Sequence, residues 1–384
     1  MAGYIMTLSD EESLRDCFYN GCYGTYFKNN DFNKWNITKE GTFADYSTMK
    51  PGDHIYFFIK RTIYGIGKIV NISDDCIYLN YPQASSLSSL NYNEISRQIL
   101  FNHNVSTDLN TRVVTFFKPA PLFFSNGVDM DDVLSSCPSV FKMLRALWKL
   151  SFIKVDDEED KAIYNIIIRR NMYNITNQYE FNENFHQRVS NMVNDTYKFN
   201  ASDFISYNHE TRAITHEMGL ELMILHQIAN KDETCLSIFG SFDYISHQVI
   251  ASPFKPIDYM DKMDIFGYSY IINDSFPHTL DFHPIDKYKV IELKKDVANE
   301  DVVNQIMNYV DFIRDEYASG DYGQIQAFIV ANTIPDNVVQ RKNEIAKRYY
   351  TIDKRPPKSQ EWNKLTLVEY KYNAATKKLE FEIK

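Results

Sequence analysis

The sequence predicts an α+β protein with a β-rich first part and a C-terminal part in which a mixed sheet lies between helical layers. Three observations lead to this prediction. Short aromatic and β-branched segments separated by turn residues fill roughly the first 120 positions. From about Met130 the spacing of apolar residues becomes helical. Beyond about residue 210, helical and strand-like segments alternate, which is typical of an α/β sandwich.

Length and composition indicate the number of domains and the broad type of protein. A chain of 384 residues has room for two or three domains, and 44% hydrophobic against 24% charged residues is ordinary for a globular protein. No run of about 18 apolar residues occurs, so we expect no membrane span. The first residues lack the features of a signal peptide, and the five cysteines form no CxxC pair. We therefore expect a cytoplasmic protein in a reducing compartment.

The net charge is −10, from 41 basic and 51 acidic residues, which is unusual for a nucleic-acid-binding protein. The distribution is uneven, however. Between Arg341 and Lys384 there are 12 Lys or Arg and 6 Asp or Glu. Phosphate binding depends on a local basic surface, so the total charge does not exclude a nucleic acid partner.

The first part contains two clear strand candidates, residues 54–59 and 64–70, with turn residues before and after them. This pattern predicts a small barrel or curled sheet. Apolar residues at helical spacing follow between Val140 and Leu150. A second helix is expected after the acidic cluster at 156–160, with an apolar face of Ile163, Ile166 and Ile167.

Three domains follow from these patterns. Residues 1–170 form the β-rich domain, and the Asn-rich segment 171–209 is a polar helical connector. Residues 210–384 form the α/β domain. Its expected elements, in order, are a helix at 213–229, strands near 236–250, 264–272 and 287–293, a helix at 299–317, a strand at 324–331 and a helix at 337–348.

The most informative segment is the apolar strand that ends in Glu292-Leu293-Lys294. Residues two apart on a strand share a face, so Glu292 and Lys294 project together and Leu293 points the other way. Another predicted strand begins with Asp264. Two carboxylates on neighbouring strands can hold Mg²⁺ and leave positions for water and a phosphate.

Two helices can add polar groups to this site. The helix before the sheet offers Glu217 and Glu221, one turn apart, either of which could direct a carboxylate toward the strands. The helix after the strand carries Gln305, with Tyr309 four residues further on the same side.

At these residues the sequence resembles the PD-(D/E)XK nuclease superfamily. The skeleton of that superfamily is a helical Glu, a strand Asp, (D/E)-x-K on the next strand and often a Gln on the following helix. These positions match Glu217, Asp264, Glu292 with Lys294, and Gln305. The string VIELKKDVANEDVVNQIMNYVDFI looks most like NucS-type endonucleases and the nuclease domain of Shedu-type anti-phage defence proteins. The resemblance covers about residues 210–335.

This resemblance implies a restriction-endonuclease-like α/β/α domain and a metal-dependent DNA endonuclease. Asp264, Glu292 and the Leu293 carbonyl would bind Mg²⁺ or Mn²⁺. Lys294 would position the attacking water or stabilise the transition state, and Gln305 and Glu217 would support the site. It also implies cleavage of phage or other foreign DNA by a homo-oligomer, a dimer or tetramer.

Some alternatives stay open. Asp281, with His278 and His283 nearby, is a rival for the aspartate ligand, although Asp264 fits the expected strand better. Glu217 is slightly preferred to Glu221. Glu292 and Lys294 could also be an exposed ion pair on an edge strand, worth under about 1 kcal/mol.

The first domain resembles the EVE and PUA-like barrels in the segment FADYSTMKPGDHIYFFIKRTIYGIGKIV. Domains of this kind read modified bases or RNA in aromatic pockets, for which Tyr26, Trp35 and Tyr46 are candidates here. We expect this domain to restrain or direct cleavage. The alternatives are a modified-nucleic-acid reader with an inactive nuclease-like scaffold, and a modification-dependent restriction enzyme.

Other reaction classes have no support in the sequence. It contains no GxxxxGK[ST], GxGxxG, HExxH or GxSxG motif. The motifs of NTP hydrolysis, dinucleotide binding, zinc peptidases and serine hydrolases are therefore absent.

Overall fold

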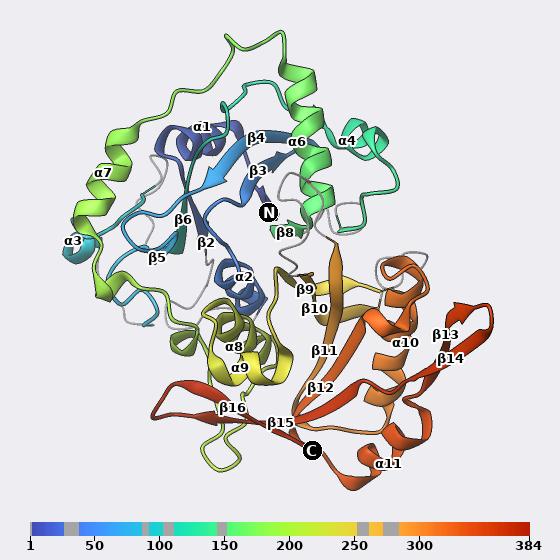
Figure 1. Cartoon of the computed structure of the whole chain (residues 1–384). Coiled ribbons are helices and arrows are strands. Elements are labelled where there is room, and N and C mark those ends of the chain that lie inside the picture. The colour runs from blue at the N-terminus through green and yellow to red at the C-terminus, as the bar shows by residue number, and fades with distance from the viewer. Residues whose placement is uncertain are drawn as a thin grey trace. The chain divides into compact units, whose positions relative to one another are not determined.

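The computed structural model describes residues 2–26, 38–86, 92–102, 111–143, 152–251, 261–271 and 284–384. The chain divides into two compact units, Met1–Phe204 and Ile205–Lys384 (Figure 1). Both units combine helices with mixed sheets, which confirms the predicted α+β class. Within the described ranges, no helix is long and apolar enough to cross a membrane.

The first unit is built on an eight-stranded sheet. Its strands run in the order β2-β6-β4-β3-β1-β8, with β5 beside β6 and β7 beside β4. The strands are β1 (Gly3–Thr7), β2 (Cys22–Tyr26), β3 (His54–Ile59), β4 (Thr62–Ile69), β5 (Ile77–Leu79), β6 (Thr111–Pro119), β7 (Val128–Asp129) and β8 (Phe152–Val155). Strands β3 and β4 are the two that the sequence predicted, and every residue of β3 is buried. The aromatic and β-branched side chains of β3 thus face packed layers on both sides of the sheet.

Crowding explains one sequence feature of β4. A side chain added at Gly67 would lie 2.6 Å from the Ile55 side chain and 2.7 Å from that of Phe117. Gly65 has a φ of +126°, beside a register shift in the β3–β4 pair. Glycine at both positions is therefore required by strand packing.

Helices flank this sheet. They are α1 (Glu11–Asn20), α2 (Thr38–Ser47), α3 (Tyr92–Ile95), α4 (Met130–Ser136), α6 (Asp157–Asn171) and α7 (Glu183–Met192), with 3₁₀ turns η1 (Asp195–Tyr197) and η2 (Ala201–Phe204). Helix α6 is the one predicted after the acidic cluster, because Asp156 accepts bonds from the N–H groups of Glu158 and Glu159 and starts it there. Most of the helix predicted between Val140 and Leu150 lies outside the described residues.

The segment predicted as a connector contains a helix that packs in the first unit. Helix α7 places His186 against the turn between α1 and β2, where the His186 ring nitrogen Nε2 lies 3.0 Å from the Gly21 carbonyl oxygen. Residues 171–204 belong to the first unit.

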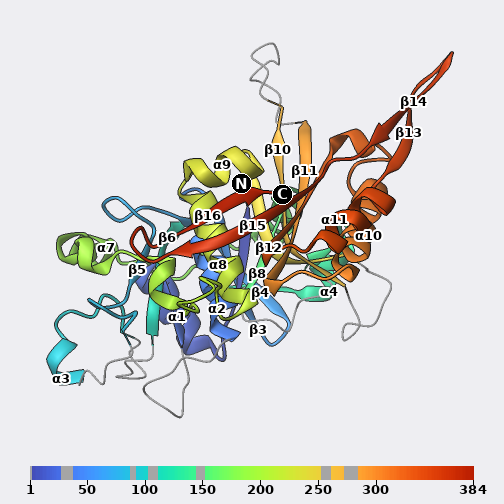
Figure 2. The ribbon, with the colours of Figure 1, turned by 90° about the horizontal axis from the view of Figure 1, so that it is seen from below.

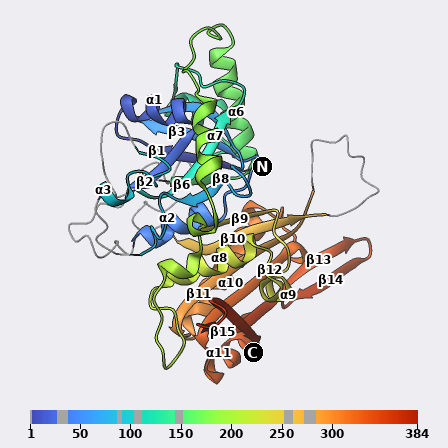
Figure 3. The same ribbon diagram turned by 90° about the vertical axis from the view of Figure 1, so that its left-hand side faces the viewer.

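The second unit has a six-stranded mixed sheet in the order β16-β15-β12-β11-β10-β9 (Figure 3). These strands are β9 (Tyr244–Ile250), β10 (Lys262–Tyr270), β11 (Ile285–Val297), β12 (Ile325–Thr333), β15 (Leu365–Asn373) and β16 (Lys378–Ile383). Strand β11 pairs antiparallel with β10 and parallel with β12, so it is an internal strand. The predicted strands at 264–272, 287–293 and 324–331 correspond to β10, β11 and β12.

Helices α8 (Glu217–Ala229) and α9 (Glu233–Phe239) lie on one side of this sheet and α10 (Asp301–Glu316) lies on the other (Figure 1). Helix α11 (Asp336–Ile345) and the 3₁₀ turn η4 (Tyr322–Gln324) complete the unit, with a separate two-stranded ribbon of β13 (Arg348–Lys354) and β14 (Pro357–Trp362). Helices α8, α10 and α11 match the predicted helices within four residues at each end.

The strand predicted near 236–250 is correct only in its second half. Residues 233–239 form helix α9, because the Asp232 carboxylate accepts bonds from the Thr234 and Cys235 N–H groups and Gly240 ends the helix at φ +70°. The apolar run in this segment was too short to distinguish a helix from a strand, whereas the aspartate cap and the glycine favour a helix.

Candidate active site

Strand β11 carries Glu292 and Lys294 on one face, as the sequence predicted. The Lys294 ammonium donates to Glu292 Oε1 at 2.8 Å. The Glu292 side chain is only 1% exposed, and that of Lys294 is 28% exposed. An exposed ion pair on an edge strand is therefore excluded, since the strand is internal and the carboxylate is buried.

Asp264 lies opposite Glu292 on the neighbouring strand. The β10–β11 register pairs Ile265 with Ile291, and the next step along the antiparallel pair brings Asp264 to Glu292. The Leu293 N–H donates to Asp264 Oδ2 at 2.7 Å. Because the N–H and C=O of one strand residue point to the same side, the Leu293 carbonyl also points toward β10. The sheet thus brings together all three predicted metal-binding groups.

Burial makes the ionised forms of both carboxylates costly. It raises the pKa of Asp264 well above its usual value, and the nearby charges of Glu292 and Glu221 raise it further, against the Leu293 N–H and Lys294. Burial also raises the pKa of Glu292 to about 6, although Lys294 opposes that shift. The second oxygen of Glu292, Oε2, is buried and accepts no hydrogen bond from a donor group in the described structure. The Asp264 carboxyl lies within hydrogen-bond range of Glu292, which opposes the rise in the Glu292 pKa. These carboxylates therefore favour a bound cation.

Glu221 enters the site from α8 and is held by two neighbours on β9. His247 Nδ1 lies 2.9 Å from Glu221 Oε2, and the Gln248 amide donates to Glu221 Oε1 at 2.7 Å. The same amide nitrogen lies 3.5 Å from Asp264 Oδ1. Gln248 thus links the helical carboxylate to the strand aspartate.

The backbone of Gln248 explains how two consecutive residues reach one carboxylate. In a regular strand, His247 and Gln248 would point to opposite faces. Gln248 has a φ of +53°, a left-handed conformation that is costly for a residue with a side chain. The turn in the backbone directs both side chains toward Glu221. Sequence reasoning missed both residues, because no motif or spacing signals a left-handed residue inside a strand.

Glu217 lies on the same helix, one turn before Glu221. Burial raises its pKa, the positive charge of Lys294 opposes the shift, and Glu221 adds to it. Glu217 therefore interacts with the Lys294 end of the site, whereas Glu221 interacts with Asp264. The choice between them stays open, since each contributes charge to a different part of the same cluster.

Gln305 reaches the site through Tyr309. Its amide donates to the Tyr309 hydroxyl at 2.9 Å, and that hydroxyl donates to the Lys262 carbonyl at 2.8 Å. Burial raises the pKa of Tyr309, and the negative charges of Glu292 and Asp264 add to the shift. Helix α10 therefore brings Tyr309 within electrostatic range of both carboxylates and holds Gln305 behind it.

Several predicted residues lie outside the described ranges. These include the rival ligand Asp281 with His278 and His283, and Trp35 and the Tyr26 side chain in the first unit. Tyr46, the third candidate for base stacking, is fully buried, and its hydroxyl bonds the Thr25 hydroxyl at 2.7 Å. The prediction was wrong for Tyr46, because its ring packs in the core beside Phe152.

The oxygen donors of the site would suit Mg²⁺ or Mn²⁺. Among the described residues, no three or more His, Cys, Asp or Glu side chains form a group that could hold a metal ion by themselves. Mg²⁺, however, keeps several waters and binds proteins through one or two carboxylates. Asp264, Glu292 and the Leu293 carbonyl meet that requirement.

Comparisons with known proteins give little further information. No protein-family model matches the chain, and no curated protein matches it. Among solved structures, the chain is similar to the crystal structure of a repair endonuclease from Pyrococcus abyssi, at 20% identity and a TM-score of 0.21. The match covers 33% of this chain and spans 43% of that protein, so it is weak and local.

Proposed function

We propose that the second unit is a metal-dependent endonuclease that hydrolyses phosphodiester bonds in DNA. One observation carries the proposal: two buried carboxylates, Asp264 and Glu292, oppose each other beside the Lys294 ammonium, and among the described residues no donor group bonds Glu292 Oε2. This combination of paired hard oxygen ligands and a lysine suits phosphate chemistry. The proposed cofactor is Mg²⁺ or Mn²⁺.

The lysine has a defined role in this proposal. Burial alone would lower the pKa of Lys294, but Glu292 and Glu217 raise it above its ordinary value of 10.5. This raised pKa favours the protonated form of Lys294, which would act as a hydrogen-bond donor rather than as a base. It would donate hydrogen bonds to the attacking water or to a phosphate oxygen, where negative charge grows in the transition state.

The carboxylates would hold the cation in a preformed arrangement. Asp264 is fixed by the Leu293 N–H, and Glu221 is fixed by His247 and Gln248, so little reorganisation is needed when phosphate enters. Asp264, Glu292 and the Leu293 carbonyl would hold the Mg²⁺ or Mn²⁺, which would supply activation of water and neutralisation of the phosphate charge.

A defence role is part of the proposal and rests on the resemblance of residues 290–313 to anti-phage nucleases. We further propose that the chain acts on foreign DNA as a homo-oligomer, since two sites can cut two strands. The first unit would restrain or direct cleavage.

A cleavage assay tests the proposal. Supercoiled, linear and single-stranded DNA are incubated with the full chain in Mg²⁺, Mn²⁺ or EDTA. We expect cutting that requires the metal and disappears in Glu292→Gln and Lys294→Ala. Lys287→Ala is the matched control, because it removes a lysine from the same strand, outside the carboxylate cluster, where it pairs with Asp286. Full cleavage by both site variants would refute the assignment.

A further inference from the structure

The β13–β14 ribbon projects from the second unit as an isolated hairpin (Figure 2). Its two strands pair only with each other in the described structure. Every residue from 351 to 361 is exposed. The seven residues of β13 span about 23 Å at 3.3 Å per residue. A two-stranded ribbon of this size fits the major groove of duplex DNA, which is about 12 Å wide.

The root of the ribbon is firmly attached. Arg348 makes a two-bond pair with Asp311 of α10, at 2.9 and 2.8 Å. Trp362 is buried, and its indole N–H donates to the Ile325 carbonyl at 2.9 Å. A paired arginine and a buried tryptophan hold the direction of the ribbon relative to the sheet.

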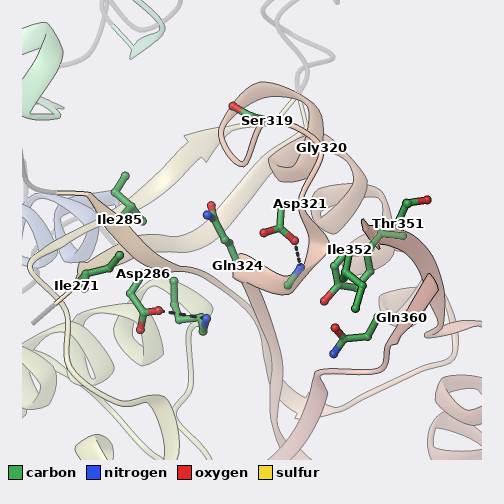
Figure 4. Close-up of a pocket in the computed structure, with 13 residues that line it drawn as sticks. Ile271, Ile285, Asp286, Ser319, Gly320, Asp321, Gln324, Thr351, Ile352 and Gln360 are labelled. Carbon is green, nitrogen blue, oxygen red and sulfur yellow. Dashed lines mark hydrogen bonds and ion pairs between the residues drawn. The ribbon is translucent and has the colours of Figure 1, made fainter. Parts of the chain in front are cut away.

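An open cavity of about 650 Å³ lies between the ribbon and one end of the sheet (Figure 4). Thr351, Ile352 and Gln360 of the ribbon face it from one side. Asp286 at the start of β11 and Gln324 before β12 face it from the other. Tyr350 packs against Tyr322 near the root, whereas residues 351–361 are exposed and accessible to a partner.

The tip of the ribbon carries two cations, Lys354 and Arg355, for which the described residues provide no carboxylate partner. Lys354 and Arg355 make no ion pair in the described part of the chain, and Lys358 lies 4.0 Å from Asp353, at the limit for a pair. Many other basic side chains of this unit are paired, as in Arg341–Glu344, Arg348–Asp311, Lys378–Asp232 and Lys384–Glu369. A chain of net charge −10 repels a polyanion overall, so its unpaired cations decide where DNA can approach.

We propose that the β13–β14 ribbon is a duplex-DNA-binding arm that holds the substrate of the site on β11. The inference rests on the proposed function. The ribbon root meets β12 at Ile325, which pairs with Tyr288, four residues before Glu292. The root is thus about 13 Å along the strand from the site, and the tip is up to about 23 Å beyond the root. The distance from tip to site is therefore comparable with the roughly 34 Å of one helical turn of DNA.

An alternative partner for the ribbon is a second copy of this chain. Ile352 at 55% exposure and Tyr349 at 69% would suit an apolar contact. Two unpaired cations at the tip argue against it, because burying them in a protein interface without carboxylates is costly, whereas phosphates would neutralise them.

The test measures binding without cleavage. Fluorescence anisotropy of a labelled 30-base-pair duplex is recorded in EDTA at 50 to 200 mM salt, with the wild type and Lys354→Ser/Arg355→Ser. Each lost phosphate contact lowers the salt slope by about 0.9. The wild type should therefore lose about twelvefold more affinity than the variant across this range. Lys378→Ser/Lys384→Ser is the control, because these two lysines of the same unit lie outside the ribbon and are paired with Asp232 and Glu369, so the variant should keep the wild-type slope.

The possible outcomes separate the inference from the proposed function. An unchanged slope in the ribbon variant, with the thermal midpoint also unchanged, would overturn the inference even if the wild type cuts DNA. A shift in sedimentation coefficient with an unchanged slope would overturn it too, and would identify the ribbon as a contact between copies. Ribbon-dependent binding by a chain that cuts no DNA would support the inference and refute only the nuclease activity.

Discussion

Neutralising Glu292 should make the protein more stable at neutral pH while removing its proposed activity. In the folded protein, burial raises the pKa of Glu292 from an ordinary value of 4.5 to about 6, even with Lys294 beside it. Ionisation of Glu292 therefore lowers the free energy of unfolding. Glu292→Gln keeps the size of the side chain and removes that cost.

The structure gives the size and the pH window of this effect. A rise in pKa from 4.5 to about 6 corresponds to about 2 kcal/mol of stability. This stability is fully present below pH 4.5, where Glu292 is protonated in both states, and it is lost as the pH rises through about 6. The variant should match the wild type near pH 4 and exceed it by about 2 kcal/mol above pH 7. For a unit of this size, that is roughly 4–8 °C in the unfolding midpoint.

Calorimetry of the full chain from pH 4 to 8 in EDTA measures the difference. Addition of Mg²⁺ or Mn²⁺ should then stabilise the wild type and leave Glu292→Gln unchanged, since only a folded site binds the ion. Glu361→Gln is the control, because Glu361 is an exposed glutamate in the same unit. Parallel pH profiles for the wild type and Glu292→Gln would refute the electrostatic reasoning.

Three further predictions concern stability. Gln248→Gly should be about 1 kcal/mol more stable to urea than Gln248→Ala, because only glycine accepts a φ of +53° without strain; equal stability would contradict the left-handed backbone. Burial raises the pKa of Glu159 to about 8, so Glu159→Gln should gain stability over the wild type as the pH rises from 4.5 through 8, measured by thermal melting. Asp232→Ala should lower the free energy of unfolding by about 1 kcal/mol, because it removes the side chain that caps the N-terminus of α9. Despite its burial, Lys378 and the cap bonds lower the pKa of Asp232 to about 2, so the loss should shrink as the pH falls from 3.8 through 2; a loss independent of pH in denaturant titrations would exclude this charge effect.

The sequence by itself determined the strands and helices that carry the candidate site. The residues before Glu292 are apolar because both faces of β11 are covered. Successive side chains of a strand point to opposite faces, so Glu292 and Lys294, two residues apart, lie on the same face. The same local patterns predicted the strand that begins near Asp264 and the amphipathic helix at 299–317, which the structure has as Asp301–Glu316. These features depend on periodicity within a few residues, which a sequence displays directly.

Other features depended on contacts between distant segments. The register of β10 against β11 decided that Asp264 faces Glu292, and the crossing of α8 brought Glu221 to His247 and Gln248. A sequence does not display register or a left-handed residue in a strand, because neither changes local hydrophobicity.

The charges of the β13–β14 ribbon are another feature that the sequence displays only in part. The excess of Lys and Arg near the C-terminus is visible in the sequence, but the sequence does not show which of them lack a carboxylate partner. Arg348 meets Asp311, 37 residues away, while Lys354 and Arg355 project without an ion pair in the described structure. Local pattern determined the elements of this protein, and only tertiary packing decided which charges are neutralised within the fold and which remain for a partner.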